Sequence, residues 1–124
     1  MLFSGLFDRF PDLKICALHG GGFLPYHLGR FDKEFTTGKK ARPAQSREAP
    51  SAYLKNLYFD TLVYDIDTLA YLKAKVGGDK LMLGTDYPYT LGDWMGVKKI
   101  HALKCPEAEK AAILEANARR LLKL

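Results

Sequence analysis

The feature that most constrains the fold of this chain is the stretch Lys80 to Pro88, KLMLGTDYP. Its apolar run, Leu81 to Leu83, is too short for a helix and is typical of a parallel strand that is covered on both faces. Gly84 ends the apolar run, Asp86 follows just past the strand, and Pro88 stops further sheet pairing. Chemistry in α/β proteins lies at the carboxyl ends of parallel strands, so Asp86 is a candidate metal ligand or general base. The alternative is that Asp86 only turns the chain and caps the next segment.

A second short apolar run, Lys14 to Leu18, leads in the same way into His19 and the glycines 20–22. Glycines between a strand and a helix allow close backbone approach and can present N–H groups to an anion. They match neither a Walker loop nor the G-x-G-x-x-G dinucleotide pattern, and HGGG lacks the G-x-S-x-G elbow of an esterase. Because His19 ends a predicted strand beside a flexible turn, we predict a functional role for it, against the alternative of a histidine that only closes the strand by hydrogen bonding. His27 and His101 fall within helical patterns and are expected at the surface.

A third strand is predicted over Leu57 to Val63, which is aromatic and β-branched and contains Asp60. A carboxylate within a strand must be paired or face a site, so Asp60 is either a further site candidate or a hydrogen-bonded strand-end residue. The expected helices cover residues 2–10, 26–35 and 51–56, a segment from Asp65 or Asp67 to Val76, and a segment that begins at Pro106. In the last of these, Asn117 is expected to cap the final turns, and Leu121 and Leu122 are expected to pack inward. A long basic loop is expected over residues 36–50.

This alternation of helices and strands indicates parallel βαβ units. Three parallel strands leave two open apolar edges, which complete domains avoid. The 124 residues are too few for an eight-stranded α/β barrel, which needs about 250, and the first predicted helix begins without a cap. The predicted fold class is therefore α/β, with residues 1–124 as one C-terminal segment of a larger barrel domain, or as a chain that pairs with another.

The positive charge of the chain is unevenly placed. Of the net charge of +5, most comes from the segment Arg30–Lys55, with seven basic residues against three acidic ones. Such a segment can attract an anionic substrate or an acidic partner, and it can equally be a solvated loop. No zinc finger, basic helix face or RNP-like motif supports nucleic-acid binding.

The sequence also predicts a soluble protein. No apolar stretch approaches the roughly 20 residues of a membrane span, and the start lacks the features of a signal peptide. Cys16 and Cys105 form no C-x-x-C pattern, so a reducing, cytoplasmic setting is expected.

Five stretches together carry a resemblance to a known family: FDRFPDLKICALHGGG, PYHLGRFDKEF, LYFDTLVYD, DKLMLGTDYPYTLGD and ILEANARRLL. They resemble the metal-dependent amidohydrolases of the decarboxylase branch, which are aminocarboxymuconate-semialdehyde decarboxylase-like. HGGG followed at this distance by GTDYP is more specific than either motif alone. The resemblance implies a (β/α)8 TIM barrel in which this chain supplies the sixth, seventh and eighth strands.

The resemblance also implies roles for three residues. Asp86 matches the aspartate that binds the catalytic metal, usually zinc, and His19 matches the histidine that handles the proton or orients the metal-bound water. Arg30 matches an arginine that reaches a substrate carboxylate in the neighbouring subunit's site, so a homo-oligomer, such as a dimer, is expected. The family's other metal ligands, an H-x-H pair and a further histidine, would precede Met1.

The activity that the resemblance implies is decarboxylation of a small unsaturated or aromatic carboxylic acid in the full-length parent. Catalytic zinc takes three protein ligands plus water, so this chain alone is expected to be metal-free and inactive. Hydrolysis or hydration of a similar acid is the alternative within the family. A non-catalytic basic module that binds an anionic partner is the alternative outside it. Neither nucleic acid nor membrane is expected as a partner.

Overall fold

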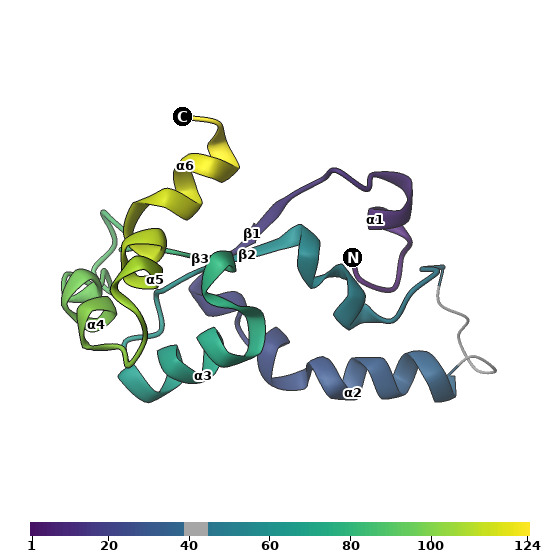
Figure 1. Ribbon diagram of the computed structural model, residues 1–124. Coiled ribbons are helices and arrows are strands. Elements are labelled where there is room, and N and C mark those ends of the chain that lie inside the picture. Colours follow the sequence, from purple (N-terminus) through teal and green to yellow (C-terminus); the bar gives the residue numbers. More distant parts are fainter. Residues whose placement is uncertain (39–44) are drawn as a thin grey trace. The chain divides into compact units, whose positions relative to one another are not determined.

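The computed structural model describes residues 1–38 and 45–124, which form two compact units (Figure 1). The first unit consists of Met1–Ile15 and Phe23–Leu57, and the second of Cys16–Gly22 and Tyr58–Leu124. The chain therefore contributes two separate stretches to each unit. The short segment with His19 belongs to the same unit as the C-terminal half of the chain.

The first unit is helical. Its elements are α1 (Leu6–Arg9), α2 (Leu24–Thr37) and the 3₁₀ helix η3 (Pro50–Asn56). α2 packs against η3, and the ring of Phe7 stacks on the ring of Tyr53, with centroids 5.6 Å apart. The buried Asn56 side chain donates hydrogen bonds to the carbonyl oxygens of Pro11 and Leu13, at 2.7 and 2.8 Å. The short helix predicted over residues 51–56 is confirmed by η3.

The N-terminal helix is shorter than the helix predicted over residues 2–10. Gly5 adopts a left-handed backbone conformation with φ of 68°, so α1 begins only at Leu6. A Cβ atom at Gly5 would lie 2.9 Å from the carbonyl oxygen of Gln45, which leaves no room for a side chain. Phe10 is exposed instead of joining Phe7 in the core. The prediction of one continuous amphipathic helix is therefore wrong.

Most residues of a three-stranded sheet belong to the second unit (Figure 1). Its strands are β1 (Ile15–Ala17), β2 (Leu57–Asp60) and β3 (Leu81–Met82), in the spatial order β1-β2-β3. β2 and β3 are parallel, with Phe59 opposite Leu81 and Asp60 opposite Met82. Every residue of β2 is buried, as expected for a central strand that is covered on both faces. The three strands occur where the sequence predicts them, although each is shorter than predicted.

Helix α3 (Ile66–Val76) follows β2 and begins as predicted. Asp65 is its N-cap, because its carboxylate accepts hydrogen bonds from the backbone N–H and the hydroxyl of Thr68, both at 2.7 Å. Leu69, Leu72 and Val76 are buried at the expected helical spacing. Gly77, with φ of 90°, ends the helix.

Consecutive helical segments form the C-terminal part of the second unit. They are α4 (Gly96–Ala102), α5 (Glu107–Ala111), a π-helical turn η5 (Ala112–Ala116) and α6 (Asn117–Leu122). η5 packs on β3, and the backbone N–H of Leu83 donates to the carbonyl oxygen of the buried Ile113, at 3.0 Å. The start predicted at Pro106 is confirmed, since α5 begins at the next residue.

Asn117 departs from its predicted role as a helix cap. It lies inside continuous helical structure and is fully buried, and its Nδ2 donates to the carbonyl oxygens of Gly78 and Leu81, both at 2.8 Å. Asn117 therefore ties the last helix to the start of β3. The inward packing predicted for Leu121 and Leu122 is wrong for Leu122, which is exposed, while Leu121 is half-buried.

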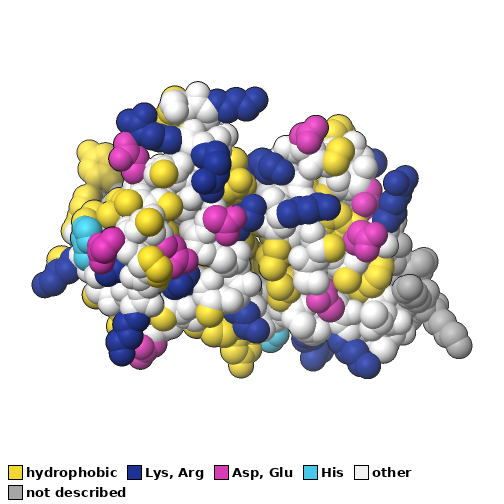
Figure 2. All heavy atoms as spheres, viewed as in Figure 1, with side chains coloured by type: hydrophobic (Ala, Val, Ile, Leu, Met, Phe, Trp, Pro, Cys, Tyr) yellow, Lys and Arg dark blue, Asp and Glu magenta, His cyan; other side chains and the backbone are white. Residues whose placement is uncertain are grey.

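Charged side chains are spread over the surface. On the face shown in Figure 2, Lys and Arg side chains occur over both units, with Asp and Glu side chains among them. In the segment predicted to be basic, Lys39, Lys40 and Arg42 lie outside the described residues, as does much of the predicted long loop. The part of the chain that the structure describes contains no helix long and apolar enough to cross a membrane.

Candidate functional site

His19 and Asp86, the two predicted site residues at strand ends, lie next to each other. Nε2 of His19 is 3.6 Å from Oδ1 of Asp86, and the side chains are 60% and 25% exposed. Both belong to the second unit; His19 lies two residues past the end of β1, and Asp86 lies four residues past the end of β3. Two residues that follow parallel strands are expected at the same edge of the sheet, and the structure brings His19 and Asp86 together there. A largely buried carboxylate beside an accessible imidazole can bind a cation and can transfer a proton.

Both residues have an unusual backbone conformation. The φ angles of His19 and Asp86 are 56° and 59°, in the left-handed region, and Tyr64, which follows β2, has φ of 55°. Few residues other than glycine adopt this conformation, and it costs of order 1–3 kcal/mol unless neighbouring contacts hold it. Each of the three strands is thus followed by a left-handed residue with a polar side chain. Two of these residues, His19 and Asp86, form the candidate site.

The turn that carries His19 is held by Asp60. The backbone N–H groups of His19 and Gly20 donate to Oδ2 and Oδ1 of Asp60, both at 2.8 Å, and the N–H of Leu62 donates to Oδ1 at 3.1 Å. Asp60 is buried at the end of β2. Gly20 has φ of 62°, and a Cβ atom there would overlap Cγ1 of Val63, so only glycine fits. Asp60 is therefore a hydrogen-bonded strand-end residue, which was one of the two interpretations of the sequence.

The anchoring of His19 by Asp60 was missed in the sequence. The two residues are 41 positions apart, and no local pattern connects them. The available signal was the ionisable residue in an apolar strand, because a buried carboxylate needs several hydrogen-bond donors. Backbone N–H groups of a glycine-rich turn are suitable donors.

The loop that carries Asp86 is closed by its own backbone. The N–H of Asp93 donates to the carbonyl oxygen of Thr85, and the N–H of Tyr89 donates to the carbonyl oxygen of Asp86, both at 2.9 Å. The peptide bond before Pro88 is cis. The apolar side chains of this loop point largely into solvent; they are Tyr87, Tyr89, Leu91, Trp94 and Met95.

The third predicted site residue, Arg30, does not belong to the second unit. It is on α2 in the first unit, and its side chain is exposed. The structure therefore joins two of the three predicted residues in one unit and leaves Arg30 on the other. His101 is exposed as predicted, whereas His27 is half-buried against the rings of Phe23 and Tyr26.

Asp86 and His19 fit one part of a metal site. A carboxylate oxygen and an imidazole nitrogen are suitable ligands for divalent cations such as Zn²⁺. Among residues 1–38 and 45–124 no group of three or more His, Cys, Asp or Glu side chains could hold a metal ion. A catalytic metal commonly takes three protein ligands, so further ligands would have to come from outside this chain.

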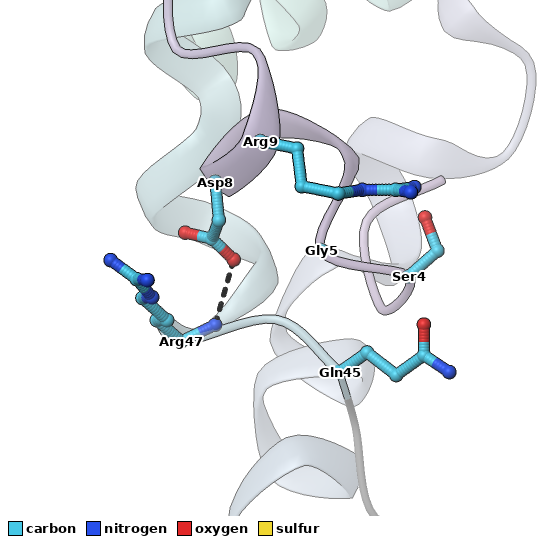
Figure 3. A pocket seen from close by; sticks show the side chains of 6 residues that line it. All are labelled: Ser4, Gly5, Asp8, Arg9, Gln45 and Arg47. Atoms are coloured by element: carbon cyan, nitrogen blue, oxygen red, sulfur yellow. Dashed lines mark hydrogen bonds between the residues drawn. The ribbon is translucent and has the colours of Figure 1, made fainter.

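A cavity of about 230 Å³ lies in the first unit (Figure 3). Its lining residues are Ser4, Gly5, Asp8, Arg9, Gln45 and Arg47. The backbone N–H of Arg47 donates to Oδ2 of Asp8 at 2.9 Å, and this bond lowers the pKa of Asp8 below its usual value. The carboxylate thus joins α1 to the segment before η3. None of the predicted site residues lines this cavity.

Comparison with known proteins places the geometry in context. The model of the amidohydrolase family matches residues 1–124. The 2-amino-3-carboxymuconate-6-semialdehyde decarboxylase of Dictyostelium discoideum is 35% identical over 125 residues, covering 100% of this chain and 35% of that protein.

Two solved structures are similar in fold. The 5-carboxyvanillate decarboxylase of Sphingomonas paucimobilis is 31% identical with a TM-score of 0.87, covering 100% of this chain and 38% of the other. The dihydroxybenzoic acid decarboxylase of Polaromonas sp. JS666, with bound manganese and 2-nitroresorcinol, is 28% identical with a TM-score of 0.86, covering 99% and 37%. This chain thus spans little more than a third of the length of these relatives. With a family match along its whole length and a shared α/β fold, the chain belongs to the amidohydrolase family.

Proposed function

We propose that this chain is the C-terminal part of a metal-dependent decarboxylase of a small aromatic or unsaturated carboxylic acid. Its three strands would be the sixth, seventh and eighth of the barrel. The observation that carries the proposal is the contact between His19 and Asp86, 3.6 Å apart at one edge of the sheet. It is supported by the relatives, which are named as decarboxylases of such acids.

In this proposal Asp86 is a metal ligand. A divalent metal bound there would supply Lewis acidity and positive charge for an anionic substrate. Zinc was predicted from the family resemblance, and a relative's structure holds manganese, so metal analysis of the purified protein must identify the ion. The Asp86 side chain is three-quarters buried, which limits the competition of bulk water for its oxygens.

His19 is the proposed acid/base residue. In a decarboxylation the bond between the substrate carbon and its carboxylate breaks, CO₂ leaves, and the electron pair stays on the carbon. A proton must then form the new C–H bond, and Nε2 of His19 can deliver it. Because the imidazole is 60% exposed, it can recover a proton from solvent after each turnover. Arg30 would pair with a substrate carboxylate in the site of a neighbouring subunit, for which the planar guanidinium is suited.

The proposal is tested in the complete gene product by two substitutions. Asp86→Ala should lose metal and activity together, because it removes a ligand. His19→Ala should retain metal and lower turnover by roughly 10² to 10⁴, the usual contribution of general acid–base catalysis. Asp79→Ala and His101→Ala, which remove an exposed carboxylate and an exposed imidazole elsewhere in the second unit, are the matched controls.

Metal content and CO₂ release from a panel of aromatic and unsaturated acids are the measurements. If Asp86→Ala keeps its metal and near-normal turnover, Asp86 is only a turn residue and the proposal fails. Consumption of an acid without CO₂ release would instead favour the hydratase or hydrolase alternative. An in-frame H-x-H in the gene upstream of Met1 would supply the expected further ligands.

The chain alone is proposed to be metal-free and inactive, since Asp86 is its single expected metal ligand and a catalytic zinc takes three. Three strands with two open edges should also cause the isolated chain to self-associate. Sedimentation that finds a cooperative monomer at micromolar concentration would contradict this expectation.

A further inference from the structure

The loop that carries Asp86 is fixed at its far end by a buried ion pair. Nζ of Lys99, on α4, contacts Oδ2 of Asp93, and the two side chains are only 13% and 7% exposed. Oδ1 of Asp93 accepts the backbone N–H of Met95 at 3.0 Å, and the backbone N–H of Asp93 donates to Thr85, next to Asp86. One aspartate therefore closes the loop and links it to α4.

The charges of Lys99 and Asp93 compensate each other within the buried pair. Among the described residues, neither Nζ of Lys99 nor Oδ2 of Asp93 has another hydrogen-bond partner. Removing one member of a buried ion pair leaves an uncompensated charge and is strongly destabilising. We therefore expect the conformation of residues 85–93 to depend on the Lys99 ammonium.

Tyr64 makes a second attachment of the same loop. Its hydroxyl donates to the carbonyl oxygen of Leu91 at 2.7 Å. Its ring lies near Lys99, with Nζ 5.7 Å from the ring centroid, which is within the range of a cation–π contact. Tyr64 follows β2 in a left-handed conformation, so it connects the end of β2 to the loop that follows β3.

We propose that Lys99, Asp93 and Tyr64 form a positioning network that holds Asp86 in its metal-binding orientation beside His19. The network acts on Asp86 through the backbone of residues 85–93 and touches neither substrate nor metal. This role rests on the proposed function, in which Asp86 is a metal ligand. It assigns a purpose to a lysine and an aspartate that the proposed chemistry does not use.

The test uses Lys99→Met in the complete gene product, which removes the ammonium and keeps the chain length. Partners that orient a metal ligand typically contribute 10–100-fold to metal affinity, so the Kd for Mn²⁺ should rise by roughly this factor. Hydrogen exchange should also speed up at the backbone amides of Tyr89, Gly92 and Asp93, whose hydrogen bonds close the loop.

Three further variants make the test specific. Lys99→Arg keeps the charge and should restore most of the Mn²⁺ affinity, and Tyr64→Phe, which removes only the hydroxyl bond to Leu91, should give a smaller effect in the same direction. Lys73→Met is the matched control, because it breaks the half-buried Lys73–Glu109 pair, 3.1 Å apart, between α3 and α5. It should lower overall stability without changing Mn²⁺ affinity or exchange in the loop.

The proposal is overturned if Lys99→Met leaves both readouts unchanged, or if Lys73→Met changes them equally. If the unsubstituted protein binds no Mn²⁺ or Zn²⁺, the proposed function fails. Hydrogen exchange at the loop amides then tests the positioning role by itself. Amides that lose protection in Lys99→Met and keep it in Lys73→Met support the network, and any other pattern rejects it.

Discussion

Replacing Asp60 by asparagine is the most informative single change in the second unit. Asp60→Asn keeps the size of the side chain and changes one carboxylate oxygen into an amide NH₂. Oδ1 can still accept the N–H groups of Gly20 and Leu62, but the amide nitrogen then faces the N–H of His19. Two donors meet there, and the turn loses the bond that fixes the backbone of His19.

The magnitude follows from the three hydrogen bonds. One charge-assisted bond is lost, about 1.5–3 kcal/mol, and two others become neutral amide bonds that are weaker by some tenths each. We therefore expect the free energy of unfolding to fall by about 2–4 kcal/mol. Turnover should fall as well, because the imidazole of His19 is no longer held against Asp86.

Urea unfolding of the complete gene product at pH 7, with turnover measured beside it, provides the assay. The control is Asp67→Asn, the same chemical change at an exposed residue in the first turn of α3, where a loss of about 0.3–1 kcal/mol is expected from the helix dipole. If Asp60→Asn costs no more than this control and turnover is unchanged, Asp60 does not anchor His19.

Three further predictions concern the same unit. Gly20→Ala should be strongly destabilising because its Cβ overlaps Val63. Gly22→Ala, whose Cβ meets nothing within 4 Å, should cost only the strain of its positive φ, about 1–3 kcal/mol; thermal unfolding that ranks the two variants in reverse would contradict this. Asn117→Ala should cost about 2–4 kcal/mol in chemical unfolding, because two buried carbonyl oxygens lose their donor, and a loss under 0.5 kcal/mol would reject the role. The side-chain and backbone hydrogen bonds from Thr68 lower the pKa of Asp65, so the stabilisation of α3 by the Asp65 carboxylate should be complete above about pH 4 and lost as the pH falls further. If the Tm difference between wild type and Asp65→Ala is equal at about pH 3 and pH 7, this prediction is wrong.

The parts of the fold that the sequence predicts well depend on local chemistry. Asp65 and the spacing of Leu69, Leu72 and Val76 define α3, because both the cap and the apolar stripe lie within one segment. The pairing of His19 with Asp86 was also predictable, since each residue follows a short apolar run and strand ends in a parallel sheet share one edge.

The parts that the sequence does not predict depend on distant contacts or on backbone conformation. The spacing of apolar residues near the N-terminus suggests a long helix, and nothing in it reveals that Gly5 is left-handed. Asn117 resembles a cap by residue type, but its partners are carbonyl groups more than 35 positions away. The sequence likewise does not predict that Lys99 and Asp93 form a buried pair, because charged residues six positions apart are ordinarily solvated.

The left-handed backbone at His19 and Asp86 also limits how this scaffold can acquire new residues at its strand ends. Glycine and asparagine adopt this conformation readily, whereas valine and isoleucine do so only with strain. A saturation library sorted only for the abundance of folded protein should therefore retain Gly and Asn at both positions and lose β-branched residues. Selection for activity alone would conceal this preference, because the backbone and the chemistry impose separate requirements on the same two positions.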